Sequence, residues 1–182
     1  MATTHAIPSV DLADFTSGDA GRKAAFVQQL GKAYEDVGFV AVKNHGIPDQ
    51  LIADLYKYVQ QFFKLPSETK HQYEVPELAG QRGYTSFGKE HAKGYEAPDL
   101  KEFFQFGQTV EDNDPIGAEY PANVQVAEVP EFTPTFFKAY RGFEKSGRFL
   151  LQAIALFLGL DETYFDDKIH NGNSILRAIH YP

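Results

Sequence analysis

The chain has 182 residues, of which 43% are hydrophobic and 23% charged, a composition typical of a globular domain with a packed core. Its formal net charge of −8 and the absence of any Lys/Arg run argue against a nucleic-acid-binding protein. No cysteine is present, which excludes disulfides, thiolate metal sites and cysteine nucleophiles. The first five residues lack the features of a signal peptide, and no apolar run approaches the roughly 18 residues of a membrane span. We therefore expect a cytoplasmic protein without a membrane partner.

The first third of the sequence alternates short extended segments with helices. Apolar residues recur at helical spacing over 19–37, and Gly38 follows as a stop signal. The run at 39–42 is short, apolar and partly β-branched, which predicts a buried strand. Pro48 suits the first position of a second helix, which ends near Leu65 and carries its apolar residues on one face. In chain order, the prediction is an extended segment over 7–12, a helix over 19–37, a strand over 39–42, a turn at His45 and Gly46, a helix over 48–65, and a short turn over 67–70 capped by Ser67.

The rest of the sequence combines irregular segments, two strands and one long helix. Glycines that include Gly83, Gly88 and Gly94, together with two prolines, make 76–101 loop-like, and a loop of this length is more often functional than idle. Thr133 can cap a helix with Pro134 at its first position, and Gly159 ends that helix. In chain order, the prediction is a loop over 76–101, a strand over 103–106, an irregular segment over 112–130, a helix over 133–158 and a strand over 175–181. The pattern is α+β, and about four short strands are too few to close a jelly roll by themselves.

Five motifs, in this order, resemble those of one protein family. They are IPSVDL at 7–12, GFVAVKNHGIP at 38–48, FFKLPSETK at 62–70, RGY with DLKEFF at 82–84 and 99–104, and LRAIHYP at 176–182. Together they resemble the isopenicillin N synthase-like dioxygenases, whose members use Fe(II) and mostly 2-oxoglutarate. The asparagine–histidine–glycine segment is fairly specific alone, whereas the other motifs gain weight from their common order.

The resemblance implies a fold, a division of the chain and an activity. The family fold is a double-stranded β-helix, or jelly roll, flanked by N-terminal helices. We therefore expect an N-terminal helical scaffold over 1–172 and the lead-in strand of the jelly-roll core over 173–182, with the jelly roll incomplete in this chain. The implied activity is that of a non-haem iron oxygenase that couples oxidative decarboxylation of 2-oxoglutarate to hydroxylation or desaturation of a small organic molecule. The alternative is a non-catalytic binding or interaction module derived from the same family.

The iron ligands of that family are missing from the sequence. They form a His-x-Asp pair with a distant His, a face that leaves the other positions of the iron open. None of the six histidines is followed two residues later by Asp or Glu, and no Arg-x-Ser, the family's keto-acid anchor, occurs. We predict no catalytic and no metal-binding residue in the chain, which alone should neither hold Fe(II) tightly nor turn over 2-oxoglutarate. A missing C-terminal half, or another chain, would then cover the open edge of the final strand.

Four residues are candidates for ligand binding. The resemblance matches Tyr181 to a tyrosine that holds 2-oxoglutarate, and a phenol can donate a hydrogen bond to a carboxylate. Arg177 lies four residues earlier, so it shares a strand face with Tyr181 and needs an anionic partner, either a protein carboxylate or the ligand. His180 would then turn outward. Arg82 and Tyr84 lie in a glycine-rich loop, where they line the substrate entrance or are simply solvated.

Overall fold

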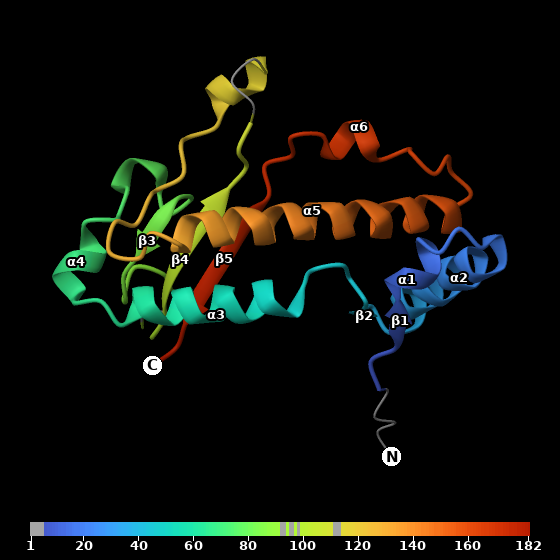
Figure 1. The fold of residues 1–182 in the computed structure, drawn as a ribbon, viewed down its shortest axis with the longest axis horizontal. Helices are drawn as coiled ribbons and strands as arrows, with labels where there is room; N and C mark the ends of the chain where they lie inside the picture. The colour runs from blue at the N-terminus through green and yellow to red at the C-terminus, as the bar shows by residue number, and fades with distance from the viewer. Residues whose placement is uncertain (1–5, 92–93, 95–96, 98, 111–113) are drawn as a thin grey trace. The chain divides into compact units, whose positions relative to one another are not determined.

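The computed structural model describes residues 6–91, 94, 97, 99–110 and 114–182. The five N-terminal residues and the start of the irregular segment predicted from residue 112 lie outside the described residues. The chain forms two compact units (Figure 1): unit 1 comprises the chain up to Pro48 together with Arg141–His170, and unit 2 comprises Asp49–Tyr140 together with Asn171–Pro182. Each unit is assembled from two separate stretches, which explains why the sequence shows no linker between domains.

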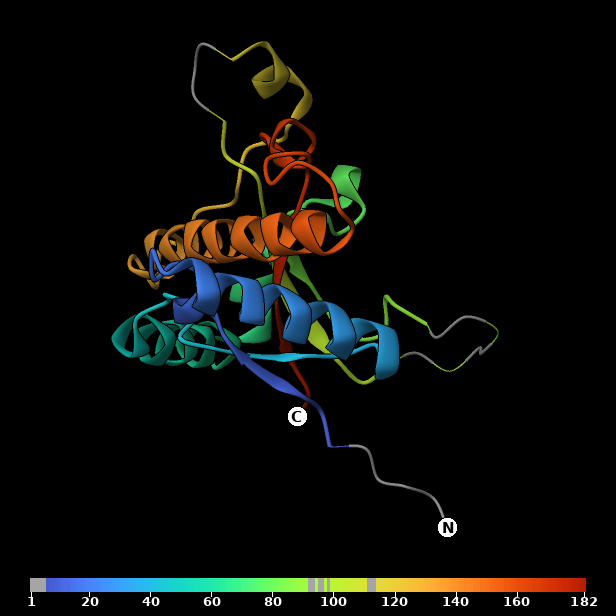
Figure 2. The same ribbon diagram turned by 90° about the vertical axis from the view of Figure 1, so that its right-hand side faces the viewer.

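Unit 1 is built on two short parallel strands. β1 (Ser9–Asp11) pairs with β2 (Ala41–Lys43), and Val10 lies opposite Val42. Parallel strands need a crossover, which α1 (Leu12–Phe15) and α2 (Ala20–Asp36) supply. Figure 2 shows α2 beside β1, and the side chain of Asp19 caps this helix by accepting a hydrogen bond from the backbone N–H of Arg22. The core of the unit contains Val10, Leu12, Phe15, Phe26, Val27, Leu30 and Ala153.

The long helix α5 (Phe132–Phe157) contributes its first residues to unit 2 and its remainder to unit 1. In unit 1 its Arg148 forms an ion pair of 2.7 Å with Asp166 of α6 (Asp166–Ile169). α5 also packs closely on α2, because the ring of Phe157 lies against Gly31. A Cβ atom at Gly31 would lie 2.1 Å from that ring. None of the helices among the described residues combines the length and the hydropathy that a bilayer span requires.

Unit 2 carries an antiparallel sheet in the order β3-β4-β5. β3 (Gly83–Thr85), β4 (Glu102–Gly107) and β5 (Ile175–His180) are in a register that places Glu102 opposite His180 and Gln105 opposite Arg177. Alternate residues of a strand point to opposite faces, so the sheet has an inner face, which carries the core, and an outer face. The inner face includes Phe104 and Phe106.

Two helices cover the inner face with aromatic side chains. Phe62 of α3 (Asp49–Phe63) meets Phe104 edge to face at 4.9 Å, and Phe136 of α5 stacks on Phe106 at 4.2 Å. In Figure 1, α3 and the first turns of α5 lie across the strands of the sheet. Shorter pieces complete the unit: α4 (Ser67–His71), η1 (Pro76–Leu78) and η2 (Pro115–Glu119).

The α+β class predicted from the sequence is confirmed, whereas several details of the prediction are wrong. The strand predicted as buried at 39–42 is β2, which starts two residues later and is largely exposed, with Phe39 68% exposed beside it. Ser67 does not cap α4, because Pro66 precedes the helix without a side-chain cap. Thr133 lies inside α5, which already begins at Phe132. The predicted loop at 76–101 contains the strand β3.

Candidate functional site

The outer face of the sheet carries Arg177, one of the predicted cofactor-binding residues. Its Nε donates a hydrogen bond of 2.6 Å to the amide oxygen of Gln105, the residue opposite it in β4. Its guanidinium lies over the ring of Phe103, 4.2 Å from the centroid, a cation–π arrangement. Its Nη1 lies 3.7 Å from a carboxylate oxygen of Glu90. Arg177 therefore lies on the outer face, which is exposed along β5 but buried along β4, where Phe103 and Gln105 are 2% and 5% exposed. Its anionic partner, Glu90, lies only at this longer distance.

Tyr181 follows directly after β5 and is 66% exposed. It precedes Pro182, and a residue before proline favours extended geometry. Extended geometry continues the alternation of the strand and directs Tyr181 to the same face as Arg177. Four residues along a strand span about 13 Å, so both side chains reach one small ligand only by leaning toward each other.

The inner face of the same sheet ends in a buried cluster of polar side chains around Glu102, which is 1% exposed. One carboxylate oxygen of Glu102 accepts hydrogen bonds from Lys70 at 2.6 Å and from the phenol of Tyr84 at 2.5 Å. The other oxygen lies 2.8 Å from Nδ1 of His180. The imidazole of His180 stacks on the ring of Phe63 at 5.2 Å. His180 thus lies on the face opposite Arg177, as strand alternation predicts, but there it contacts Glu102 and Phe63 of the core.

The protonation states in this cluster follow from the contacts. Burial raises the pKa of Glu102, but the hydrogen bonds from Lys70, Tyr84 and His180 outweigh it, so that the pKa lies below its ordinary value of 4.5. Burial, together with the bond to the Glu102 carboxylate, raises the pKa of Tyr84 well above its ordinary value of 10. Glu102 is therefore the charged acceptor and Tyr84 the neutral donor. A carboxylate only accepts, so the Nδ1 of His180 carries the proton of their hydrogen bond.

Sequence analysis gave no role to Glu102 or to Lys70, although both lie within the motifs of the resemblance. A usable signal existed for Glu102, because it stands at even spacing from Phe104 and Phe106 and must share their face of the strand. A carboxylate on a core face needs a partner. Lys70 lies 32 residues earlier, and only the fold brings the two together.

Arg82 and Tyr84, the predicted substrate-binding residues, are not solvated loop residues. Arg82 is 1% exposed, and its guanidinium fills the space where a Cβ atom on Gly107 would lie, 1.9 Å from the Cζ atom of Arg82. Its Nη1 donates to the backbone oxygen of Gln81 at 2.8 Å, while Nε and Nη2 have no hydrogen-bond partner among the described residues. Burial lowers the pKa of Arg82. Tyr84 lies on β3 and is equally buried, with its phenol on Glu102.

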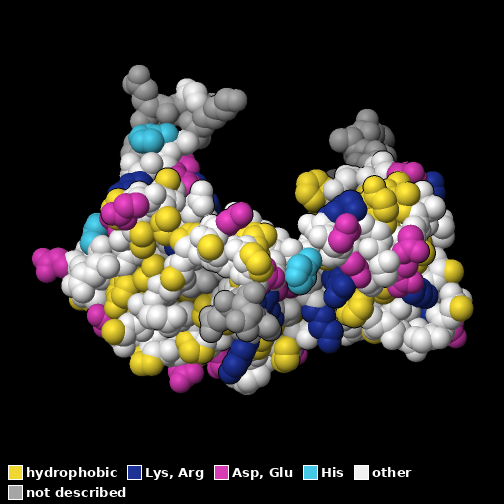
Figure 3. Space-filling view, turned by 90° about the horizontal axis from the view of Figure 1, so that it is seen from above, with side chains coloured by type: hydrophobic (Ala, Val, Ile, Leu, Met, Phe, Trp, Pro, Cys, Tyr) yellow, Lys and Arg dark blue, Asp and Glu magenta, His cyan; other side chains and the backbone are white. Residues whose placement is uncertain are grey.

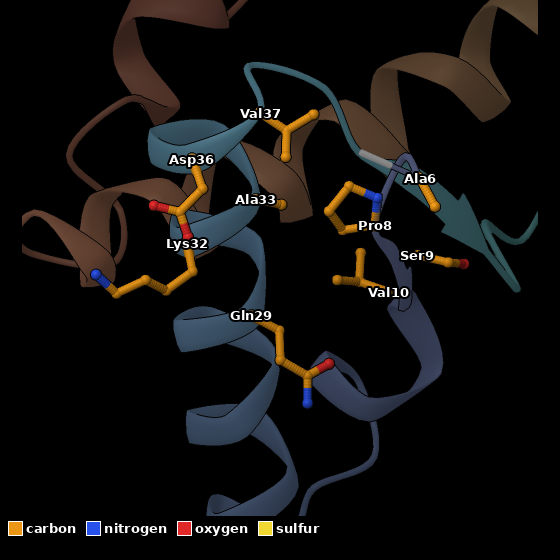
Figure 4. A pocket seen from close by; sticks show the side chains of 9 residues that line it. All are labelled: Ala6, Pro8, Ser9, Val10, Gln29, Lys32, Ala33, Asp36 and Val37. Carbon is orange, nitrogen blue, oxygen red and sulfur yellow. The ribbon is translucent and has the colours of Figure 1, made fainter. Parts of the chain in front are cut away.

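A pocket of about 590 Å³ lies in unit 1 between β1 and α2 (Figure 4). Its lining is largely apolar, with Pro8, Val10, Ala33 and Val37, and the side chain of Lys32 points away from it. Lys32 pairs instead with Glu35 at 3.1 Å. The other polar residues of its lining are Ser9, Gln29 and Asp36. On the face seen in Figure 3, basic and acidic side chains of the described residues are interspersed.

A fit to iron requires three or more His or carboxylate side chains that converge on one point. Among the described residues, no group of three or more His, Asp or Glu side chains could hold a metal ion. The described side chains therefore do not fit an iron centre.

Comparison with known proteins gives consistent matches. Residues 7–131 match the family model described as non-haem dioxygenase in morphine synthesis N-terminal. The proline hydroxylase buaE from Petromyces alliaceus is 33% identical over 183 residues, covering 97% of this chain and 55% of that protein. A protein from Caulobacter crescentus assigned to the 2OG-Fe(II) oxygenase family superposes with a TM-score of 0.87 at 35% identity, over 98% of this chain and 57% of that one. A full-length Neurospora crassa protein in complex with alpha-KG and thymine superposes with a TM-score of 0.80 at 27% identity, over 97% and 55% respectively. The chain thus spans about half the length of these relatives.

Proposed function

The chain belongs to the non-haem dioxygenase N-terminal family, and on this premise we propose that it is the N-terminal part of an Fe(II)- and 2-oxoglutarate-dependent oxygenase. The whole enzyme would couple oxidative decarboxylation of 2-oxoglutarate to hydroxylation or desaturation of a small organic molecule. The observation that carries this proposal is the family match over most of the chain, together with the agreement of its backbone with oxygenase structures. The alternative, a non-catalytic interaction module, has no observation of its own in its favour.

We propose that the chain has two parts, and the sheet of unit 2 supports this division. Residues 1–172 would form the helical scaffold, and 173–182 the lead-in strand of a jelly roll that further polypeptide completes. Support comes from β5, which is the edge strand of its sheet and exposes Ile175 and Ile179 on the outer face. An edge strand with exposed apolar residues is the type of surface on which another strand or another layer packs.

We propose that Tyr181 and Arg177 bind 2-oxoglutarate. Both offer N–H or O–H donors on the outer face of the sheet, and a keto-acid carboxylate needs donors of this kind. Arg82 and Tyr84 would affect the substrate indirectly, because a direct contact would require their packing to open. Bound Fe(II) would supply the oxidation chemistry, with ligands from outside the described residues. The thymine complex of the Neurospora crassa protein supports a small organic molecule as the class of substrate.

The test compares the full-length protein with the 182-residue chain in an assay for succinate formed from 2-oxoglutarate in the presence of Fe(II). We expect turnover by the full-length protein, and neither turnover nor tight iron binding by the chain alone. In the full-length protein, Tyr181→Phe should raise the KM for 2-oxoglutarate about tenfold, since one hydrogen bond to a charged group is lost. Tyr164→Phe, at another exposed tyrosine, is the matched control. Absence of 2-oxoglutarate consumption by the full-length protein would favour the interaction module.

A further inference from the structure

The end of β5 is held from its inner side by a fixed carboxylate. Glu102 and His180 lie directly opposite each other at one end of the β4–β5 ladder and share a hydrogen bond of 2.8 Å. The carboxylate cannot turn away, because Lys70 and Tyr84 hold its second oxygen. Lys70 is 7% exposed and donates in addition to the backbone oxygen of Phe63 at 3.3 Å. His180 therefore meets an acceptor whose position is also held by contacts that do not involve β5.

The second contact of His180 fixes the plane of its ring. The imidazole lies at 25° to the ring of Phe63, the last residue of α3. Hydrogen bond and stacking together leave the side chain one orientation, although 41% of its surface is exposed. This exposure matters for a test, because a substitution at His180 does not open a hole in the core.

A buried ion pair needs an explanation beyond stability, because removing two charges from water costs about as much as their attraction returns. We explain the buried ion pair by its effect on the register of β5. A slip of one residue turns every side chain of a strand to the other face. In β5 such a slip would place Ile179 or Tyr181 opposite Glu102 and leave its carboxylate without the imidazole. The cluster thus selects the register in which His180 faces inward.

The geometry points to Glu102 and His180 as positioning residues that fix the end of β5 and thereby direct Tyr181 to the outer face of the sheet. This inference rests on the proposed role of Tyr181 as a donor to 2-oxoglutarate. The backbone links His180 to Tyr181. Tyr181 follows His180 directly and is kept extended by Pro182, so Tyr181 points away from Glu102 when His180 points toward it.

The test uses His180→Leu and His180→Asn in the full-length protein. Leucine removes the donor, whereas the amide nitrogen of asparagine can take the place of Nδ1 and donate to Glu102. We expect affinity for 2-oxoglutarate about tenfold weaker in His180→Leu, a smaller change in kcat, and recovery to within about threefold of the wild type in His180→Asn. His170→Leu, at an exposed histidine of unit 1, is the control for the substitution type.

A second measurement needs neither ligand nor turnover. The protein is labelled with 3-fluorotyrosine, and the ¹⁹F signal of Tyr181 is identified by its loss in Tyr181→Phe. We expect this signal to shift or broaden in ligand-free His180→Leu and to stay at the wild-type position in His180→Asn. Equal behaviour of the two variants, in affinity and in the ¹⁹F spectrum, would overturn the inference. If the wild-type protein does not bind 2-oxoglutarate, the proposed function fails, while the ¹⁹F spectra still decide whether His180 positions Tyr181.

Discussion

Lys70 and Arg82 are two buried cations of unit 2, and replacement by methionine should destabilise the protein at Lys70 but not at Arg82. Lys70 lies 2.6 Å from the carboxylate of Glu102, which is 1% exposed. Lys70→Met keeps most of the side-chain volume but leaves that carboxylate with only Tyr84 and His180 as donors. Removing one partner of a buried ion pair costs about 3–5 kcal/mol. This loss is a large share of the roughly 5–15 kcal/mol by which a typical domain is stable.

Arg82 differs because no carboxylate of the described residues forms an ion pair with its guanidinium. Two of its nitrogens make no hydrogen bond to the described residues, and each unsatisfied buried group costs about 1–3 kcal/mol. Arg82→Met removes this cost, together with one hydrogen bond to Gln81 worth about 1 kcal/mol and part of the packing on Gly107. The expected result lies between no change and a gain of about 2 kcal/mol.

The assay is urea unfolding followed by far-UV circular dichroism, with the free energy of unfolding obtained by linear extrapolation. Urea is preferred because guanidinium chloride would screen the charges in question. Similar slopes in the wild type and both variants would show that the same unit unfolds. A loss of more than about 2 kcal/mol in Arg82→Met would contradict the argument, because it would mean that the guanidinium has a stabilising partner.

Three further predictions concern pH, one backbone position and the outer face. The pKa of Glu102 is lowered in the folded state, so its contribution to stability is complete above the ordinary value of 4.5 and is lost as the pH falls through the folded-state pKa. Urea midpoints should therefore fall more steeply below about pH 4.5 in the wild type than in Glu102→Gln. Gly83→Ala should destabilise the protein by about 2–4 kcal/mol, because φ is +74° and the new Cβ would lie 2.3 Å from a backbone oxygen. Gly38→Ala is the control: φ is +81° but the space is open, so the loss in the same unfolding assay should be only about 1–2 kcal/mol. Equal losses in the two variants would contradict the contribution assigned to the steric clash at Gly83. The 182-residue chain should bind a fluorescent hydrophobic dye through the outer face of β5, and Ile179→Lys should reduce the signal; a dye-negative monomer by light scattering would contradict this.

Local sequence signals were sufficient for the long elements of the fold. The helix over 19–37 was predicted within one residue at each end, because Asp19 caps it and Gly38, at φ of +81°, ends the segment. The strand at 103–106 was recognised from its aromatic run and is one residue longer at each end. These elements carry their own start signals, stop signals and periodicity.

The strand β3, which the sequence did not predict, shows what local sequence patterns do not determine. It has three residues, starts at a glycine with positive φ, and is held by pairing with β4 some twenty residues later. Nothing within 83–85 distinguishes it from a loop, and the partner is known only from the fold. The burial of Arg82 and Tyr84 also depends on residues distant in sequence, because Arg82 packs against Gly107 and Tyr84 packs against Phe62. The prediction that Tyr84 lies in a loop was therefore wrong for the same reason that β3 was missed, and the burial of Arg82 was not predicted either.

The two faces of the sheet separate the demands of folding from those of the proposed 2-oxoglutarate site. On the inner face, Glu102 has three donors at 2.8 Å or less, which folding requires of a buried charge. On the outer face, Arg177 has an amide oxygen at 2.6 Å and a carboxylate only at 3.7 Å, so its guanidinium retains donors for an incoming anion. Strand alternation makes this separation possible, because adjacent residues belong to different faces. A substitution that disturbs the inner cluster should therefore change ligand affinity without touching the ligand, whereas one at Tyr181 should change affinity without changing stability.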